Sequence, residues 1–483
     1  MAGLNKYPLI YELNTRVWLR ELSAKAGRAL TLAEVPEVEF QKWQNWGVRV
    51  LWLMGIWEES PKARMMARTH SELWRAYQRA LPDVGERDIV ASPYAIARYS
   101  VSADLGGEAA LAKFRHRLSE HGIRLMLDFV PNHLALDCEW IETHPEFFIS
   151  VPAHIAEKMP DDFVEHGGLY YACGKDPYFP AWTDTLQLNY ANPAVHEAMC
   201  RVLRKVANLC DGVRCSMAML VLKDTFNHTW GHFGLEMKEE FWQKAICAVK
   251  ENFPHFLFVA EAYWDTEWAL QQQGFDFVYD KRLYDRIRSR DIEGIKAHLR
   301  GAVRYQQKLI RFIENHNEER AAQAFGANHR AAALLTYTAI GAHLLHEGEH
   351  DGLRTRLPVQ LIRRPNEEVD FSTVDFYHRL MRLCQNASIT NGDFHVLSGY
   401  SDAGIIAFER QSGGHTGHTL TFVNLTAEPC ESYFPTIALN HIQDYEHIEV
   451  FVTDPRKSPQ FELWQGGVSV RLRPHEGLVF VVR

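Results

Sequence analysis

The sequence predicts an α/β fold: a closed (β/α)8 barrel, with a small domain inserted after its third strand and an all-β sandwich domain at its C-terminal end. Two observations support this expectation. Short apolar runs alternate with longer amphipathic stretches up to about residue 390, and beyond that point only short strand patterns and turns remain. The 483 residues are too many for one ordinary core and suit a large domain with smaller additions.

Eight apolar runs are the candidate barrel strands. They span residues 9–15, 48–55, 123–130, 212–216, 256–262, 275–280, 309–315 and 342–348. Each run is too uniformly apolar to leave one face in water, so we expect parallel strands that are covered on both sides. Repeated strand–helix units of this number favour a closed barrel over an open sheet.

Two further segments depart from the strand–helix alternation. Residues 134–185 form a connection much longer than an ordinary strand-to-helix loop and contain HPEFF and HGGLYYACGKDPYFPAW, which predicts a small inserted domain. The barrel would then comprise residues 1–133 and 186–390. Residues 391–483 contain five short strand patterns, GIIAFERQ, TLTFVNLT, IEVFVTD, GVSVRLRP and GLVFVVR, separated by turns such as WQGG, and predict a sandwich.

Composition excludes several classes of partner. A net charge of −9 argues against nucleic acids and anionic membranes, because both need a basic surface. No apolar run approaches the length of a membrane span, and the N-terminal MAGLNKYPLIYEL lacks the apolar core of a secretion signal, so we expect a cytoplasmic protein. The eight cysteines include no close C-x-x-C pair, which gives no sign of a disulfide framework or a zinc site. The oligomeric state is not predicted.

Polar residues follow four of the predicted strands. Asp128 and His133 follow the third strand, Arg214 and Ser216 the fourth, Glu261 the fifth, and His316 with Asn317 the seventh. Closure of a barrel brings the carboxyl ends of all its strands to one rim, which is where barrel enzymes place their reacting groups. We therefore expect these side chains to meet.

Four of these segments resemble the short motifs of the α-amylase family of glycoside hydrolases. They are DFVPNH (128–133), GVRCS (212–216), AEAYW (260–264) and ENHNEER (314–320), in the family's order. SPYAIARY (92–99) and DTLQLNYANPAV (184–195) resemble two further motifs. The resemblance covers essentially the whole chain and implies a glycosidase or transglycosylase acting on α-glucosidic oligosaccharides with retention of configuration.

The resemblance also implies roles for the residues that bind substrate. Tyr94 would stack on a sugar ring, and His133 and His316 would hydrogen-bond its hydroxyls. Asp128 would brace Arg214, which in turn would lie beneath the nucleophile and keep it ionised. No cofactor is expected. The resemblance also admits calcium, with Asn132 as one ligand, but the sequence identifies no acidic partner for it and no metal site is assigned.

The catalytic positions depart from the family pattern. Glu261 stands where the family has its acid/base, but Ser216 occupies the place of the nucleophilic aspartate and Asn317 that of the stabilising aspartate. A retaining glycosidase needs a second carboxylate about 5 Å from the acid. A serine hydroxyl carries no charge and needs a base of its own. We therefore expect hydrolysis to be strongly impaired, with Arg214 left facing a hydroxyl.

Other carboxylates offer no replacement in the sequence. Asp211 begins the fourth strand and so lies at the wrong end of the barrel, and Asp265, like Asp224, lies beyond a strand end. Three readings remain open. One is an enzyme scaffold impaired by these two changes, whether natural or introduced. Another is a non-catalytic relative that binds sugars or partner proteins, mildly supported by Arg98 and Glu349 at positions where the family suggests an acid and a glutamine. The last is direct attack by water with inversion, for which no base is identified.

Overall fold

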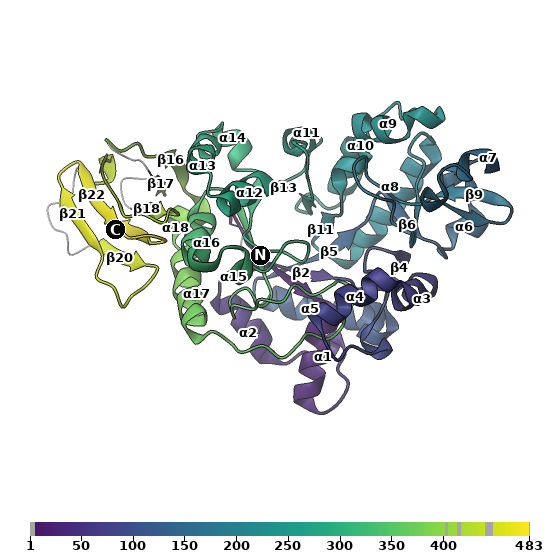
Figure 1. Ribbon diagram of the computed structural model, residues 1–483, viewed down its shortest axis with the longest axis horizontal. Helices are drawn as coiled ribbons and strands as arrows, with labels where there is room; N and C mark the ends of the chain where they lie inside the picture. The colour runs from purple at the N-terminus through teal and green to yellow at the C-terminus, as the bar shows by residue number, and fades with distance from the viewer. Residues whose placement is uncertain (1–4, 401–403, 413–416, 440–447, 483) are drawn as a thin grey trace.

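The computed structural model describes residues 5–400, 404–412, 417–439 and 448–482. Eight parallel strands close into a barrel in the order β1-β15-β14-β13-β12-β11-β5-β2 (Figure 1). All eight predicted strands are present, which confirms the predicted fold class. They are β1 (Leu9–Asn14), β2 (Val48–Met54), β5 (Arg124–Phe129), β11 (Gly212–Cys215), β12 (Leu257–Ala260), β13 (Phe277–Tyr279), β14 (Leu309–Arg311) and β15 (Ala342–His346).

The seventh strand is shorter than predicted. The apolar pattern indicated residues 309–315, but pairing stops at Arg311 of β14, which lies opposite His343 of β15. Residues 312–316 stay buried without joining the ladder. The apolar pattern therefore indicated which residues are buried here, not which residues pair in the sheet. His316 lies several residues beyond the end of the strand.

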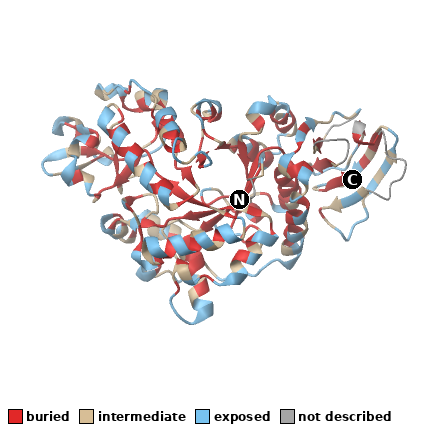
Figure 2. Cartoon of the chain, turned by 180° about the vertical axis from the view of Figure 1, so that it is seen from behind, coloured by how far each residue is buried: buried red, intermediate tan, exposed pale blue. Residues whose placement is uncertain are grey.

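Helices surround the barrel and bury their apolar faces against it (Figures 1 and 2). One example is α8, which begins with Pro193 in its first turn while the Asn192 side chain accepts a hydrogen bond from the Ala194 amide at 3.0 Å, a favoured helix start. The helices are α1 (Thr15–Ala26), α2 (Glu37–Asn45), α3 (Pro61–Thr69), α4 (Ser71–Ala80), α5 (Gly107–Glu120), α8 (Pro193–Leu209), α9 (Lys223–Trp230), α10 (Phe241–Lys250), α11 (Glu267–Gln272), α12 (Lys281–Ser289), α13 (Ile292–Leu299), α14 (Val303–Gln306), α15 (Ala321–Ala324), α16 (His329–Thr338), α17 (Phe371–Cys384) and α18 (Ala387–Asn391).

The long connection between β5 and β11 forms small sheets of its own beside the barrel, at the right of Figure 1. One sheet pairs β6 (His133–Ala135) with β10 (Thr185–Gln187). A second contains β7 (Ser150–Val151), β9 (Leu169–Ala172) and β8 (Phe163–His166), with the short helices α6 (Trp140–Thr143) and α7 (Ala153–Ala156) nearby. A further pair, β3 (Trp57–Glu59) with β4 (Ile96–Val101), follows β2. The division at residues 133/134 and 185/186 remains a prediction.

The C-terminal region consists of two antiparallel sheets. The first has the order β16-β17-β18-β23-β20 and the second β19-β22-β21. Phe422 and Phe434 meet between the sheets with ring centroids 5.1 Å apart, and the other face of the first sheet reaches α16, where Thr421 donates a hydrogen bond to Thr338 at 3.3 Å. The strands are β16 (Asp393–Val396), β17 (Ile405–Gln411), β18 (His418–Asn424), β19 (Cys430–Pro435), β20 (Ile448–Val452), β21 (Gln460–Trp464), β22 (Gly467–Leu472) and β23 (Gly477–Val482).

Within the described residues, none of the helices combines the length and the apolar character that crossing a bilayer requires.

Candidate active site

Strand register brings the predicted residues to one end of the barrel. Arg214 on β11 lies directly opposite Asp128 on β5 and Val259 on β12. Glu261 follows the last residue of β12, and Ser216 follows the last residue of β11. Because parallel strands all run in the same direction, these three strand ends share a rim. Their polar side chains therefore lie within reach of one another.

An ion pair between Arg214 and Glu261 occupies the centre of the site. A guanidinium nitrogen, Nη2, lies 2.7 Å from Oε2 of Glu261, and both side chains are almost fully buried. The expectation that Arg214 would face only a hydroxyl is wrong. With no carboxylate at position 216, the acid on the neighbouring strand is the nearest anion, and a buried cation is strongly destabilised unless it has one.

Four further groups donate hydrogen bonds to the same carboxylate. Oε2 of Glu261 accepts from the Met217 amide at 2.7 Å and from the Ser216 hydroxyl at 3.3 Å. Oε1 accepts from the Tyr263 hydroxyl and the Asn317 side-chain amide, both at 2.9 Å. Met217 reaches this position in the left-handed region, with φ of 44°. The residue expected to act as acid/base is thus held from five directions.

Asp128 is fixed mainly by neutral donors. Its two oxygens accept from the Trp52 indole and from the Gly55 amide, each at 3.2 Å, whereas Nη1 of Arg214 is 3.9 Å away. Gly55 has a φ of +79°, a conformation that L side chains rarely adopt. Burial raises the pKa of Asp128 to about 7, although Arg214 acts in the opposite direction.

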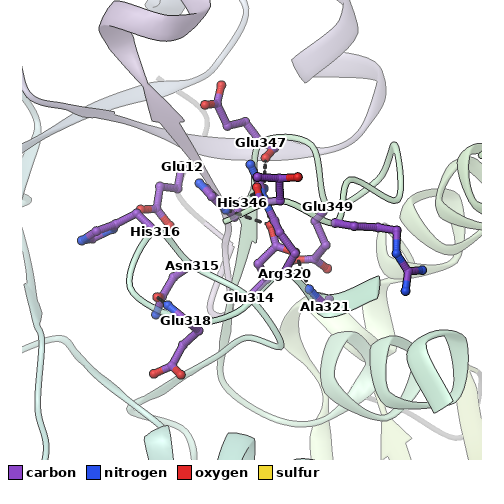
Figure 3. A network of polar contacts seen from close by, with 12 residues as sticks. Glu12, Glu314, Asn315, His316, Glu318, Arg320, Ala321, His346, Glu347 and Glu349 are labelled. Atoms are coloured by element: carbon purple, nitrogen blue, oxygen red, sulfur yellow. Dashed lines mark hydrogen bonds and ion pairs between the residues drawn. The ribbon is translucent and has the colours of Figure 1, made fainter. Parts of the chain in front are cut away.

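Beside Arg214, whose guanidinium lies over the Tyr94 ring, a second polar group links Tyr94, His316 and Glu12. The Tyr94 hydroxyl lies 2.7 Å from Nε2 of His316, and their rings stack with centroids 5.5 Å apart. Nδ1 of His316 pairs with Glu12 (Figure 3). Burial lowers the pKa of His316 to about 3 and raises the pKa of Glu12 to about 7. A neutral imidazole with its proton on Nδ1 satisfies both neighbours.

Glu12 was missed by the sequence analysis, although a signal existed. It is an acid inside the otherwise apolar run LIYELN of β1, and it is completely buried. A carboxylate in a buried strand requires a polar partner, and at a barrel rim that partner is a candidate for function. His316, far along the chain, is that partner.

His133 lies at the edge of this group. It begins β6, its ring is 5.1 Å from that of Trp182, and it hydrogen-bonds the main chain of Tyr94. Burial lowers the pKa of His133 to about 4, so the ring is neutral. Its contact with Tyr94 connects it to the predicted sugar-stacking residue.

The residues around Asn132 do not fit a calcium site. Its side-chain oxygen and nitrogen both pair with the amide of Gln187, at 3.0 Å each, so the two buried amides satisfy one another. Within the described ranges, no group of three or more His, Cys, Asp or Glu side chains is arranged to hold a metal ion.

Two acids that the sequence offered as poor replacements have cationic partners of their own. Asp211 accepts from the Leu125 amide at the start of β5 and pairs with Arg115, which places it near the amino end of that strand as expected. Asp265 pairs with Arg282. Glu349, at the position where the family suggests a glutamine, accepts hydrogen bonds from the hydroxyls of two buried tyrosines on α16 and α17.

The profile of the alpha-amylase catalytic domain matches residues 42–360, well over half of the chain. The fold and rim define a barrel of the glycoside-hydrolase type. More particularly, the chain belongs to the alpha-amylase family.

Individual relatives are distant. The alpha-amylase MalA of Haloarcula japonica is 24% identical over 344 residues, which cover 68% of this chain and 47% of that protein, so the match spans about half of the relative's length. An alpha-amylase structure from H. orenii aligns with a TM-score of 0.69 at 17% identity over 99% of this chain and 100% of that one. A maltogenic alpha-amylase from Thermotoga neapolitana gives 0.67 at 18% identity over 99% of both chains. At such identities the structural likeness concerns the fold.

Proposed function

We propose that this chain is a glycosidase or transglycosylase scaffold that binds α-glucosidic oligosaccharides at the barrel rim and is strongly impaired in their hydrolysis. The observation that carries the proposal is the 2.7 Å ion pair between Arg214 and Glu261. It occupies the place where the family resemblance implies an arginine beneath a nucleophilic aspartate. Among the expected sugar-contacting residues, the Tyr94 ring lies over the same guanidinium, and His316 and His133 each hydrogen-bond Tyr94.

The chemistry of retention explains the impairment. One carboxylic acid must protonate the leaving oxygen while a second carboxylate attacks the anomeric carbon. Ser216 offers an uncharged oxygen that already donates to Glu261 at 3.3 Å. The Asn317 side-chain amide likewise donates a hydrogen bond to Glu261 at 2.9 Å. Neither position therefore supplies a carboxylate to form or stabilise the glycosyl intermediate.

Inverting hydrolysis lacks support from the same contacts. It requires a base that activates water on the Ser216 side. Both oxygens of Asp128 already accept hydrogen bonds from Trp52 and Gly55, and Glu12 is fully buried against His316. Neither acid is placed to receive a proton from water beside the substrate.

A purely sugar-binding role is the second candidate, and the many contacts that hold the Glu261 carboxylate favour it. An acid/base has to release and recover a proton in each cycle. Here five groups converge on the carboxylate of Glu261, one of them a guanidinium. That arrangement suits a structural ion pair better than a proton shuttle.

A paired assay separates the candidates. Hydrolysis of 4-nitrophenyl α-glucoside and of maltose is measured for the chain and for the double variant Ser216→Asp/Asn317→Asp. The matched control, Ser119→Asp/Asn208→Asp, adds the same two charges at exposed positions on α5 and α8. Turnover that appears only in the first variant supports the enzyme scaffold. Silence in all three, with maltose still bound, supports the binding role, and full hydrolysis by the unaltered chain contradicts the proposal.

A further inference from the structure

A hollow rich in arginine opens beside His316. It lies between the ends of β1 and β2, the loop after β14 and the segment that follows β15, and it has a volume of about 360 Å³ including space open to solvent. Three arginines line it, Arg320, Arg356 and Arg364, and the single acid among its lining residues is Glu347. The hollow adjoins the rim because His316 belongs to both.

Two of the three guanidinium groups have carboxylate partners. Arg320 pairs with Glu314, as Figure 3 shows, and it also donates to the main-chain oxygen of Glu347 at 2.6 Å. Arg364 lies 3.2 Å from the Glu347 carboxylate and 2.6 Å from that of Glu21. The charges of these arginines are therefore matched within the protein.

Arg356 differs from both. It donates to the main-chain oxygen of Asn317 at 3.0 Å, and no carboxylate forms an ion pair with it in the part of the chain that the structure describes. Its positive charge reaches the rim, since it contributes to lowering the pKa of His316. An aspartate at position 317 would have placed a negative charge beside this arginine, and the asparagine does not.

An unused buried donor accompanies this charge. The Asn315 side-chain oxygen accepts from the amides of Asn317 and Glu318, at 2.8 and 3.0 Å, which fixes the orientation of the side chain. Its amide nitrogen has no hydrogen-bond partner within the described ranges, although the residue is only 1% exposed and lines the hollow. A buried donor without a partner is costly unless a ligand or water satisfies it.

We propose that this hollow binds the phosphate group of a phosphorylated α-glucoside whose sugar ring lies at the rim. Guanidinium and amide donors match the oxygens of a phosphate ester, and charge-assisted hydrogen bonds of this kind are about twice as strong as neutral ones. The inference rests on the proposed function, because the sugar occupies the site described there. It further specifies that the preferred ligand carries a negative charge.

Ligand-observed NMR titration tests the inference with methyl α-D-glucoside, its 6-phosphate and inorganic phosphate. We expect the phosphate ester to bind about tenfold more tightly than the neutral glucoside, the gain of one charge-assisted hydrogen bond. Arg356→Met should remove most of that difference. Arg354→Met is the matched control, since Arg354 is also exposed but contacts Gln323 outside the hollow and should leave the difference unchanged.

The outcomes separate this inference from the proposed function. Equal affinity for the two glucosides, or equal loss in the two arginine variants, overturns the phosphate site while leaving sugar binding intact. Inorganic phosphate that binds as tightly as the ester overturns the part of the inference that concerns sugar. Absence of binding by either glucoside to the folded protein overturns the proposed function itself.

Discussion

The two sides of the barrel rim differ in how they are held together. On the His316 side, Glu12, His316 and Tyr94 form a continuous chain of neutral or nearly neutral contacts. On the Glu261 side, Arg214 and Glu261 form a buried ion pair surrounded by the uncharged Ser216 and Asn317. The His316 side thus has the residue types that the resemblance implies. The Glu261 side has a serine and an asparagine where the resemblance implies aspartates, and Glu261 pairs with the arginine.

Arg214 has an anionic partner although position 216 carries no carboxylate. Removing a carboxylate beside a buried arginine leaves a cation that needs a partner. Glu261 is close enough to provide it, and Trp52, Tyr94 and Tyr279 surround the same guanidinium with ring faces 5.1 to 5.7 Å from its carbon. The buried guanidinium is therefore paired and enclosed without an acid at position 216.

The largest effect should come from restoring one acid on the Glu261 side. Ser216→Asp alone should raise hydrolysis of 4-nitrophenyl α-glucoside by at least about 100-fold, because members of a catalytic set act as a unit and the nucleophile matters most. Asn317→Asp alone should change the rate by less than about threefold, since it supplies no nucleophile. Equal gains from both single variants would argue against these roles.

Removal of the central anion should destabilise the protein. Glu261→Gln leaves Arg214 with the Tyr279 hydroxyl and with the carboxylate of Asp128 3.9 Å away, and we expect the free energy of unfolding to fall by about 3–5 kcal/mol, the usual cost of breaking a buried ion pair. Denaturant unfolding measures the change. The control is Glu319→Gln, whose partner Arg288 is 2.9 Å away at the surface, with a cost below about 1 kcal/mol. Similar costs would contradict the account.

Glu12, on the His316 side, should make the stability of the protein depend on pH. The raised pKa of Glu12, about 7 when folded, means that the folded chain holds a proton that the unfolded chain has released. This group therefore contributes stability that is complete below about pH 4.5 and is lost as pH rises through about 7, by at most about 3 kcal/mol.

Glu12→Gln isolates that contribution. Unfolding free energies of the chain and of the variant are compared from pH 4.5 to 8. Buried histidines titrate in both proteins, so their effect on stability largely cancels in the difference between the two free energies. The difference between them should shift in favour of the variant as pH rises. A difference that stays constant would show that Glu12 is not the titrating group.

The smallest effect concerns single hydroxyls on the two sides. Tyr94→Phe leaves Nε2 of buried His316 without its 2.7 Å partner and should cost about 1 kcal/mol of unfolding free energy. Tyr263→Phe should cost less, because Oε1 of Glu261 still accepts from Asn317 at 2.9 Å. The reverse order would indicate that Glu261 depends on Tyr263 more than its other contacts suggest.

The amino-acid sequence predicted the frame of the barrel but not all of its contacts. Uniformly apolar runs located all eight strands, because a parallel strand covered on both faces cannot be polar. The same apolar pattern predicted β14 to extend too far, since residues 312–316 are buried without pairing. In the sandwich, β16, β19 and β21 were missed. Burial alternates along these strands, and β21 reads exposed, half-buried, exposed, so no apolar run marks it.

The site was predicted less completely than the fold. The motifs located Arg214, Glu261 and His316, because their order along the chain fixes which strand ends carry them. The partner that Arg214 takes depends on distances across two strands, and Glu12 joins His316 from more than 300 residues away. Such pairings depend on three-dimensional geometry that spacing along one strand does not contain.

A double-mutant cycle between positions 216 and 261 tests the central claim most directly. The cost of Glu261→Gln is measured by denaturant unfolding in the unaltered chain and again in the Ser216→Asp variant. The account predicts that the cost falls by at least about 2 kcal/mol when an aspartate at 216 becomes the partner of Arg214. Equal costs in the two backgrounds would contradict the account, because the contribution of the Arg214–Glu261 pair would then not depend on the residue at position 216.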